Sequence, residues 1–582
     1  MCGIIAYIGS KNVQKMLIQG LQQMEYRGYD SAGIAFISGG KIKVVKDKGS
    51  VNNLESQINF GEKTSVGIGH TRWATHGKAD RINAHPHTSA DKKWAIVHNG
   101  IIDNAEEIEK TYLQGVKCVS DTDTERAAEL LSTFDCDELN VVLRTCGIIK
   151  GSFAFACIKE GDNKVYLAKR SSPLYAAVGE SGCMAASDVR CFSCFAKKFY
   201  SLNDDEIAVM KSDGIEFYDL NGNKIQKMTE ILPECYGGAK VKSGYNTIKE
   251  IKEIPAVVNA VDGIYDKKYL DEKLKGIDLK EYDKVYLIGC GTSYHASLFG
   301  AEIFRRRGIN AYAVIASEFI VRPVRKDAKV LAFLVSQSGE TADVLSLIAD
   351  LKINKIKTVA VTNVTCSTLA RLAEVYLPMC AGEEIAVAST KAYDAELIVF
   401  YKLAEYFSGE NACDLTALSQ EVNGYRLDEN LLNKISDSEK IFSIGRNLDY
   451  YTALECALKL KEITYKNVNA YPAGELKHGP LALIDDKSLI IAFATDKDVF
   501  LKTLNGVSEG VYRGADCVIF TTEKCVKGYT GDKSKLCILK DFGELTSVLA
   551  ILPMQYCAYE ISVKQGINPD KPRNLAKSVT VL

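Results

Sequence analysis

The chain has 582 residues, with 72 Lys and Arg against 74 Asp and Glu, and a formal net charge of −2. This balance argues against a nucleic-acid-binding protein, which usually carries a basic excess, and the mean hydropathy of −0.06 with short apolar runs argues against a membrane protein. At about 150 residues per domain, the length predicts several domains.

Residues 1–225 alternate short strand-like runs with glycine-rich turns and contain few helical patterns. This mixture predicts an α+β domain with packed antiparallel sheets. Strands are expected over 4–9, 32–37, 95–100 and 153–158, and helices over 12–24 and 124–132. Over residues 226–253 the pattern loses its period and includes Pro233, Gly237 and Gly238, which predicts a linker.

Beyond the linker, apolar strands alternate with helical stretches, as in a parallel sheet covered by helices on both faces. The turn around Gly289 recurs around Gly445, which indicates an internal repeat of two doubly wound α/β domains. We expect these domains over 254–425 and 426–566, followed by a C-terminal tail over 567–582. The expected strands are 284–288, 311–315, 329–335 and 358–362 in the first copy and 440–444, 488–493 and 516–521 in the second.

Cys2 could carry chemistry because removal of Met1 would leave a thiol and a free α-amine on one residue. An α-amine has a pKa of about 7.7–8.0 and a thiol about 8.5, so near neutral pH the amine can accept the thiol proton and assist acyl transfer. A small residue after the initiator methionine also needs no function. The motifs that follow decide between the two interpretations.

Four further motifs follow Cys2-Gly3-Ile4 in order, at residues 26–33, 69–77, 98–100 and 120–123. Together they resemble the N-terminal-nucleophile (class II) glutamine amidotransferases, which have an αββα sandwich fold. Glutamine needs a cation for its carboxylate and an anion for its ammonium group, since either charge would otherwise be desolvated without a partner. The resemblance assigns these roles to Arg72 and Asp123, with Thr75 and His76 lining the same site.

The same resemblance implies the catalytic groups for glutamine. Cys2 would be the nucleophile, and the Asn99 side chain with the Gly100 N–H would form an oxyanion hole. Ammonia released at Cys2 would be protonated in bulk water, so a closed passage to a second site is expected, with Trp73 as its gate. Trp73 as an ordinary core aromatic is the alternative.

Clustered histidines and cysteines offer a metal site as another interpretation. Five of the seven histidines fall within 70–98, but no thiolate or carboxylate follows at zinc-ligand spacing, and Cys191 with Cys194 form a lone pair. The N-terminus has no secretory signal pattern, so the 18 cysteines are expected to be reduced thiols in a cytoplasmic protein. We therefore expect no metal and no organic cofactor.

Two strand-to-helix turns in the first repeat point to a sugar phosphate. The turn at Gly289 opens a helix, but Tyr294 stands where a dinucleotide fingerprint needs its third glycine. Hydroxyls and backbone N–H groups at a helix N-terminus, as in Ser336–Thr341, suit a phosphate monoester. Together the turns resemble sugar-isomerase (SIS) domains. The residues implied to bind the sugar phosphate are Thr292, Ser293, Ser336, Gln337, Ser338, Thr341, Val387, Ser389 and Lys459.

The second repeat has Ala492-Phe-Ala-Thr495 near the equivalent place and no such hydroxyl cluster, so one sugar phosphate per chain is expected. The paired resemblances cover essentially the whole chain. They imply an enzyme that moves the amide nitrogen of L-glutamine to D-fructose 6-phosphate and isomerises the product to D-glucosamine 6-phosphate.

The isomerisation needs a ring opening, an imine at C2 and a proton moved between C1 and C2. The resemblance places the proton-shuttling carboxylate at Glu462, one helical turn from Lys459, and the ring-opening group at His478. Lys577 would form a Schiff base with the open-chain sugar. The alternative is that Lys577 is a solvated tail residue without a chemical role. A homodimer is also implied, with His478 reaching the neighbouring copy's sugar site.

Alternatives within and outside this class remain. An amidophosphoribosyltransferase would need a phosphoribosyl-diphosphate loop, an asparagine synthetase an ATP-pyrophosphatase loop, and a silent sugar-phosphate sensor would lack Cys2, Glu462 or His478. The chain departs from the usual pattern at several positions, which leaves fine details of sugar affinity open. The departures are Glu383, Ala386, Asp394, Leu582 and the missing histidine after Gly244-Tyr245.

Overall fold

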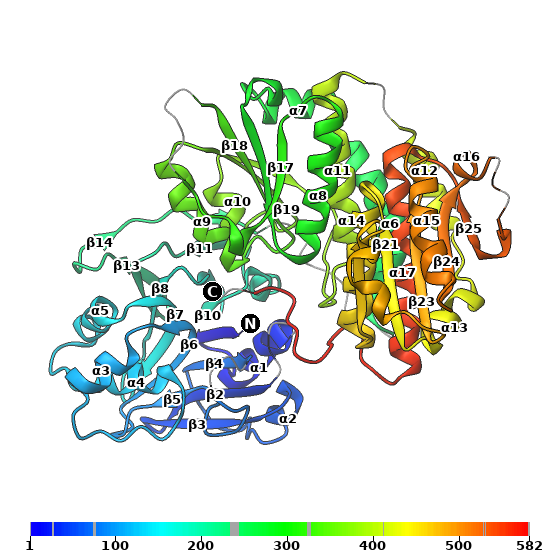
Figure 1. Cartoon of the computed structure of the whole chain (residues 1–582). Helices are drawn as coiled ribbons and strands as arrows, with labels where there is room; N and C mark the ends of the chain where they lie inside the picture. The colour runs from blue at the N-terminus through cyan, green and yellow to red at the C-terminus, as the bar shows by residue number, and fades with distance from the viewer. Residues whose placement is uncertain are drawn as a thin grey trace. The chain divides into compact units, whose positions relative to one another are not determined.

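The computed structural model of the chain describes residues 2–25, 28, 30–73, 77–232, 244–322, 328–410, 413–527, 529 and 531–579. Its contacts divide the chain into two compact units, one formed by residues 1–239 with the chain end from Ala576, the other by residues 240–575. Each unit is described by itself below, and Figure 1 shows the elements of both.

The first unit is a sandwich of two antiparallel sheets. Its eight-stranded sheet has the order β15-β11-β9-β10-β1-β4-β2-β3, and its seven-stranded sheet has the order β14-β13-β12-β8-β7-β6-β5. The strands are β1 (Gly3–Gly9), β2 (Ser31–Ser38), β3 (Lys41–Lys48), β4 (Val66–Arg72), β5 (His87–Thr88), β6 (Trp94–Ile102), β7 (Gly151–Lys159), β8 (Val165–Arg170), β9 (Tyr175–Gly179), β10 (Gly182–Ala186), β11 (Lys198–Ser201), β12 (Glu206–Lys211), β13 (Gly214–Tyr218), β14 (Lys224–Ile225) and β15 (Glu230–Ile231).

Alternation along the strands explains the layers. Ile4, Ala6 and Ile8 of β1 pack in one core with Ala95 and Val97 of β6, so the sheets face each other. The opposite face of the seven-stranded sheet packs on helices α3 (Ala105–Tyr112), α4 (Asp123–Thr133) and α5 (Glu138–Ile148). Helix α1 (Val13–Met24) covers β1 and β4, with α2 (Val51–Glu55) beside it. The αββα sandwich is therefore confirmed.

The second unit contains two five-stranded parallel sheets of the same topology. Their orders are β17-β16-β18-β19-β20 and β22-β21-β23-β24-β25. The strands are β16 (Lys284–Gly289), β17 (Ala311–Ile315), β18 (Val330–Ser336), β19 (Lys357–Thr362), β20 (Val375–Pro378), β21 (Lys440–Gly445), β22 (Val468–Pro472), β23 (Ser488–Ala494), β24 (Asp516–Thr522) and β25 (Leu536–Leu539). The expected repeat and its strands are confirmed.

Helices cover both faces of each parallel sheet, so the strands read as nearly continuous apolar runs. In the first repeat, α8 and α11 lie on one face and α9 and α10 on the other (Figure 1). The helices of this unit are α6 (Asn246–Ile264), α7 (Lys267–Lys273), α8 (Gly291–Arg306), α9 (Ala342–Ile353), α10 (Thr368–Leu372), α11 (Lys391–Ser408), α12 (Leu415–Gly424), α13 (Glu429–Asp437), α14 (Leu448–Thr464), α15 (Phe500–Val511), α16 (Glu523–Val526) and α17 (Thr546–Lys564).

Helix α6 begins within the stretch that we expected to be a linker. Its first turn is held by the Asp570 carboxylate, which accepts hydrogen bonds from the backbone N–H groups of Asn246 and Thr247, both at 2.8 Å. A partner so distant in sequence leaves no local signal, which is why the periodicity of 226–253 did not predict the helix. Among the helices of the described residues, none is both long enough and apolar enough to cross a bilayer.

Candidate active site

The Cys2 thiol lies where two neighbouring strands of the first unit bring distant residues together. Strands β1 and β4 pair antiparallel with Gly3 opposite Thr71, so Cys2 lies beside the end of β4. The Trp73 backbone N–H donates a hydrogen bond to Cys2 Sγ at 3.3 Å. Burial raises the pKa of the Cys2 thiol, so a base at the site has to take its proton before attack.

Asn99, which we predict to be part of the oxyanion hole, lies beside Cys2. Asn99 Nδ2 donates to the Cys2 carbonyl at 3.2 Å. His70 Nε2 lies 3.0 Å from both Asn99 Oδ1 and the His98 carbonyl, and only a protonated Nε2 satisfies both acceptors. Burial lowers the pKa of His70 to about 3, so the ring is neutral and fixes which way the Asn99 amide points. We did not predict this role of His70, although it lies in the 69–77 motif.

Gly100 is required by the backbone at its place in β6. Its φ is 127°, and a Cβ there would lie 2.1 Å from the Ser152 carbonyl of the neighbouring strand β7. Any side chain would therefore push the two strands apart. This explains a glycine directly after Asn99.

The two charged groups predicted for glutamine are held differently. Arg72 is 4% exposed at the end of β4, and burial lowers the pKa of its guanidinium. An anion bound beside it would stabilise the charged form. Asp123 starts α4, and its carboxylate accepts the Ile102 N–H at 2.8 Å. Thr75 and His76 lie outside the described residues, so their roles stay predictions.

The clustered histidines form a packed stack. His70 and His85 stack at a centroid distance of 4.2 Å, and His87 meets His85 edge-on. Burial lowers the pKa of each of these rings, so all three are neutral. Within the described ranges no group of three or more His, Cys, Asp or Glu side chains is arranged to hold a metal ion, and no disulfide joins Cys191 to Cys194.

The predicted phosphate turn lies at the carboxyl end of β18 in the second unit. Ser336 Oγ is 2.8 Å from Thr341 Oγ1 and accepts the Gly339 N–H at 3.1 Å, while Ser338 Oγ accepts the Glu340 N–H at 3.1 Å. Gly339 has a φ of 65°, and a Cβ there would lie 2.1 Å from Ser367 Oγ. These contacts within the turn fix its backbone.

Glu462, the predicted proton shuttle, and Lys459, predicted to bind the sugar phosphate, lie in an ionic chain on α14. Lys459 is 1% exposed, and its Nζ lies 2.6 Å from the Glu462 carboxylate and 3.3 Å from that of Glu455. Thr292 of α8 joins the chain, since its Oγ1 accepts from Lys459 at 3.1 Å and donates to Glu455 at 3.0 Å. His295 Nδ1 lies 2.7 Å from the other Glu455 oxygen.

These contacts shift the pKa values of Glu455 and Lys459 in opposite directions. Burial alone would raise the pKa of Glu455, but Lys459, His295 and Thr292 together hold it below its usual value. Burial alone would lower the pKa of Lys459, and the two carboxylates raise it above its usual value. Lys459 is therefore a fixed cation beside Glu462. Neither Glu455 nor His295 was predicted, because each is placed by packing between α8 and α14.

Three hydrogen bonds hold the loop that carries Val387 and Ser389. Ser389 Oγ donates to the Glu384 carboxylate at 3.0 Å, and the Val387 N–H donates to the Asp570 carbonyl at 3.1 Å. Glu250 of α6 accepts the Ala386 N–H at 3.1 Å. These supporting residues were not predicted.

Two of the unusual residues have structural partners nearby. Asp394 is fully buried and accepts from Gln555 Nε2 at 3.0 Å, and burial raises the pKa of its carboxyl group. The Glu383 carbonyl accepts from Lys391 Nζ at 2.7 Å. Leu582 lies outside the described residues.

The described contacts do not test the roles of three predicted residues. His478 is exposed at the end of the short 3-10 helix Glu475–His478, and Trp73 is half-buried beside Cys2. Lys577 is half-buried in the tail, in a different compact unit from Glu462. Their roles as ring-opening group, gate and Schiff-base lysine stay predictions.

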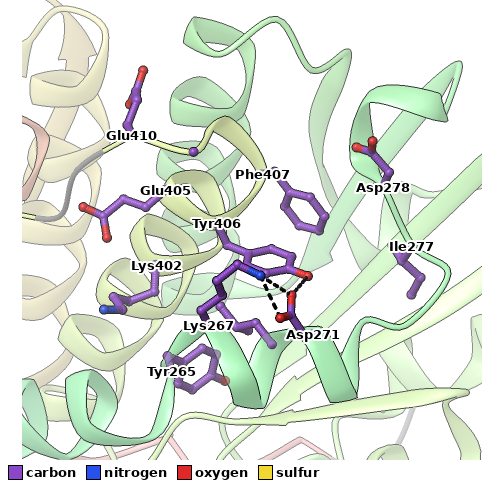
Figure 2. Close-up of a pocket in the computed structure, with 12 residues that line it drawn as sticks. Tyr265, Lys267, Asp271, Ile277, Asp278, Lys402, Glu405, Tyr406, Phe407 and Glu410 are labelled. Carbon is purple, nitrogen blue, oxygen red and sulfur yellow. Dashed lines mark hydrogen bonds and ion pairs between the residues drawn. The ribbon is translucent and has the colours of Figure 1, made fainter.

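A cavity of about 610 Å³ lies elsewhere in the second unit, and none of the predicted site residues lines it. Figure 2 shows its charged wall, where Lys267 pairs with Asp271 at 2.7 Å and Tyr406 Oη donates to the same carboxylate at 2.9 Å. Since these groups satisfy one another, the cavity gives no indication of a ligand.

Family models match both units. A glutamine amidotransferase domain model matches residues 70–194, and a SIS domain model matches residues 278–406 and 434–560. Isomerizing glutamine–fructose-6-phosphate aminotransferases of Caldanaerobacter subterraneus and Fusobacterium nucleatum are both 38% identical to the chain over 100% of both sequences.

Among solved structures, the C-terminal domain of glucosamine-fructose-6-phosphate aminotransferase from Francisella tularensis is 29% identical, with a TM-score of 0.51. It covers 57% of this chain and 100% of its own. A tagatose-6-phosphate ketose/aldose isomerase structure from Clostridium novyi, 18% identical with a TM-score of 0.50 over 58% of this chain and 94% of its own, shares the fold of the second unit.

Proposed function

The chain belongs to the isomerizing glutamine–fructose-6-phosphate aminotransferases, and from this premise we propose which residues carry each step. It transfers the amide nitrogen of L-glutamine to D-fructose 6-phosphate and isomerises the product, giving D-glucosamine 6-phosphate and L-glutamate, the first step toward UDP-N-acetylglucosamine. The contact of buried Lys459 with half-buried Glu462 at 2.6 Å, in the same unit as the Ser336 turn, is the observation that supports the sugar half.

In the glutaminase half, Arg72 binds the glutamine carboxylate and Asp123 its ammonium group. The Cys2 sulfur attacks the side-chain carbonyl, and its proton passes to the α-amine that removal of Met1 exposes. The oxyanion accepts hydrogen bonds from Asn99 Nδ2 and the Gly100 N–H. Ammonia then leaves, and water hydrolyses the thioester to glutamate. The support is the position of Asn99 Nδ2 beside Cys2, fixed by neutral His70.

In the sugar half, the Ser336–Thr341 turn binds the phosphate with Thr292 and Ser293 nearby. His478 assists ring opening, and Lys577 holds the open sugar as a Schiff base until ammonia replaces it at C2. Glu462 then moves the proton from C1 to C2. Lys459 Nζ lies 2.6 Å from the Glu462 carboxylate and holds it in position for that transfer.

The remaining proposals concern the surroundings. We propose that Trp73 gates the passage of ammonia and that residues 567–582 act as a lid. The exposed position of His478 suits a contribution to a neighbouring copy, so a homodimer is proposed. We also propose a cytoplasmic location, where thiols stay reduced; no disulfide joins the described cysteines. We propose no metal or organic cofactor, since side chains are available for each proton transfer.

The direct test incubates the purified protein with glutamine and fructose 6-phosphate and measures hexosamine phosphate. The unmodified protein should form it, and Cys2→Ala should lose glutamine use while any sugar isomerisation without ammonia persists. Formation of glutamate without hexosamine phosphate would contradict the sugar half. Loss of both activities in Cys2→Ala would contradict the division into two sites.

A further inference from the structure

The second repeat contains a counterpart of the phosphate turn, and strand register identifies it residue by residue. Lys284 of β16 pairs with Val330 of β18, and Lys440 of β21 pairs with Ser488 of β23. Counting along each strand from these pairs, Ser336-Gln337-Ser338 corresponds to Ala494-Thr495-Asp496. The same comparison of β16 with β21 matches Gly289 with Gly445.

The helix starts correspond as well. Ser293 and Asp449 each stand four residues after the matched glycine, in the first turns of α8 and α14. A Cβ on Gly289 would lie 2.9 Å from the Ser293 carbonyl carbon, and one on Gly445 would lie 2.3 Å from that of Asp449. The two helix starts therefore pack against their strands in the same way, and Asp449 occupies the place of Ser293.

The Asp449 carboxylate takes up the donors of the second turn. Its Oδ2 accepts the backbone N–H groups of Thr495 at 2.8 Å and Asp496 at 3.3 Å, and its Oδ1 accepts Thr495 Oγ1 at 2.6 Å. The side chain is 1% exposed. Two backbone N–H groups and a hydroxyl at the end of a parallel strand are the donors that an oxygen-rich anion uses.

The first repeat has no carboxylate at this position. Ser293 carries a neutral hydroxyl, which donates to Glu396 Oε1 at 2.7 Å. Burial raises the pKa of Glu396 to about 8, so this neighbour is protonated near neutral pH and adds no negative charge. A phosphate entering the first turn therefore meets no fixed anion at Ser293, whereas one entering the second turn meets Asp449 and the adjacent Asp496.

We propose that Asp449 is a built-in anion that fills the second repeat's counterpart of the phosphate site, so that each chain binds a single sugar phosphate. This rests on the proposed role of Ser336–Thr341 as the phosphate turn. Once Asp449 is removed, the freed donors of Thr495 and Asp496 form a site for a phosphate monoester or inorganic phosphate. The carboxylate excludes such ligands both by occupying the donors and by charge repulsion.

The test measures binding of radiolabelled inorganic phosphate by equilibrium dialysis to the full-length protein, with fructose 6-phosphate saturating the first repeat. The unmodified protein should bind no additional phosphate, and Asp449→Ser should bind one more per chain at millimolar concentrations. Asp496→Ser is the matched control, because it removes a neighbouring charge without freeing the turn's donors. A folded Asp449→Ser protein with no additional phosphate, or an equal gain in Asp496→Ser, would overturn the proposal.

The reverse substitution keeps the proposal testable if Asp449→Ser does not fold. Ser293→Asp should weaken fructose 6-phosphate binding at least 100-fold, whereas the neutral Ser293→Asn should weaken it about 10-fold or less. Equal losses in the two variants would overturn the proposal. If the unmodified protein itself binds no fructose 6-phosphate, the proposed function fails, which is a different outcome from unmodified binding without a gain in Asp449→Ser.

Discussion

Replacement of Lys459 by methionine should expose how strongly the buried ionic chain depends on one cation. Methionine keeps the length of the apolar stem but leaves Glu455 and Glu462 facing each other without the ammonium that lies 3.3 and 2.6 Å from them. Glu455 is fully buried, whereas the Glu462 side chain is 20% exposed and regains some hydration. The loss at Glu455 should therefore dominate.

Removal of one partner from a buried ion pair costs about 3–5 kcal/mol when the remaining charge is left uncompensated. Because His295 and Thr292 still contact Glu455 in the variant, we expect the lower end of this range. For a unit of this size, about 3 kcal/mol corresponds to a fall in Tm of about 4 °C. In the unmodified protein the lowered pKa of Glu455 means that its contribution is present above the unfolded pKa of about 4.3 and lost as pH falls. Without Lys459, burial should raise that pKa, so the deficit in stability should be largest near pH 7 and shrink toward pH 5.

The assay is thermal unfolding of the full chain between pH 5 and 7, with product formation measured alongside. Lys487→Met is the matched control, because Lys487 pairs with Glu439 at 3.2 Å with both side chains more than 60% exposed, where an ion pair contributes at most about 1 kcal/mol. Lys459→Met should also lose hexosamine phosphate formation and keep glutaminase activity. A Tm within about 2 °C of that of the unmodified protein at pH 7, or a loss of stability independent of pH, would contradict the stabilisation of Glu455 by Lys459.

Two further predictions concern the tail. Borohydride reduction in the presence of fructose 6-phosphate should trap the sugar on Lys577, as found by peptide mapping, and labelling of another lysine would contradict the Schiff-base role. Asp570→Ala should raise the KM for fructose 6-phosphate more than it lowers kcat. The Asp570 side chain holds the start of α6, and its backbone carbonyl accepts the N–H of Val387, a residue predicted to bind the sugar. Asp570→Asn, which keeps an acceptor, should lose less, and equal effects in the two variants would argue against this hold.

The strands and the chemical motifs were predictable because their signals are local. The apolar runs of β16, β18, β21 and β23 appear where the sequence places them, since a strand buried on both faces needs a continuous apolar stretch. The spacing of Lys459 and Glu462 by three residues puts them on one helical face, and their contact follows from that spacing.

The supporting contacts were not predictable because they join residues that only the fold brings together. Asp570 meets Asn246 across 324 residues, and Glu455 meets His295 across 160. Asp449 has no motif of its own, and its role became visible only when strand register matched it with Ser293. The sequence therefore predicts groups proposed to act on substrate, and the structure adds the residues that contact and hold them.

The transfer of nitrogen from glutamine to the sugar is tested most directly by isotope labelling. The protein is given glutamine labelled with ¹⁵N in the amide, fructose 6-phosphate and an excess of unlabelled ammonium, and the hexosamine phosphate is analysed by mass spectrometry. If the sugar site uses ammonia released at Cys2, most of the product should carry ¹⁵N. Unlabelled product, or labelled ammonium in solution with glutamate and no amino sugar, would contradict it.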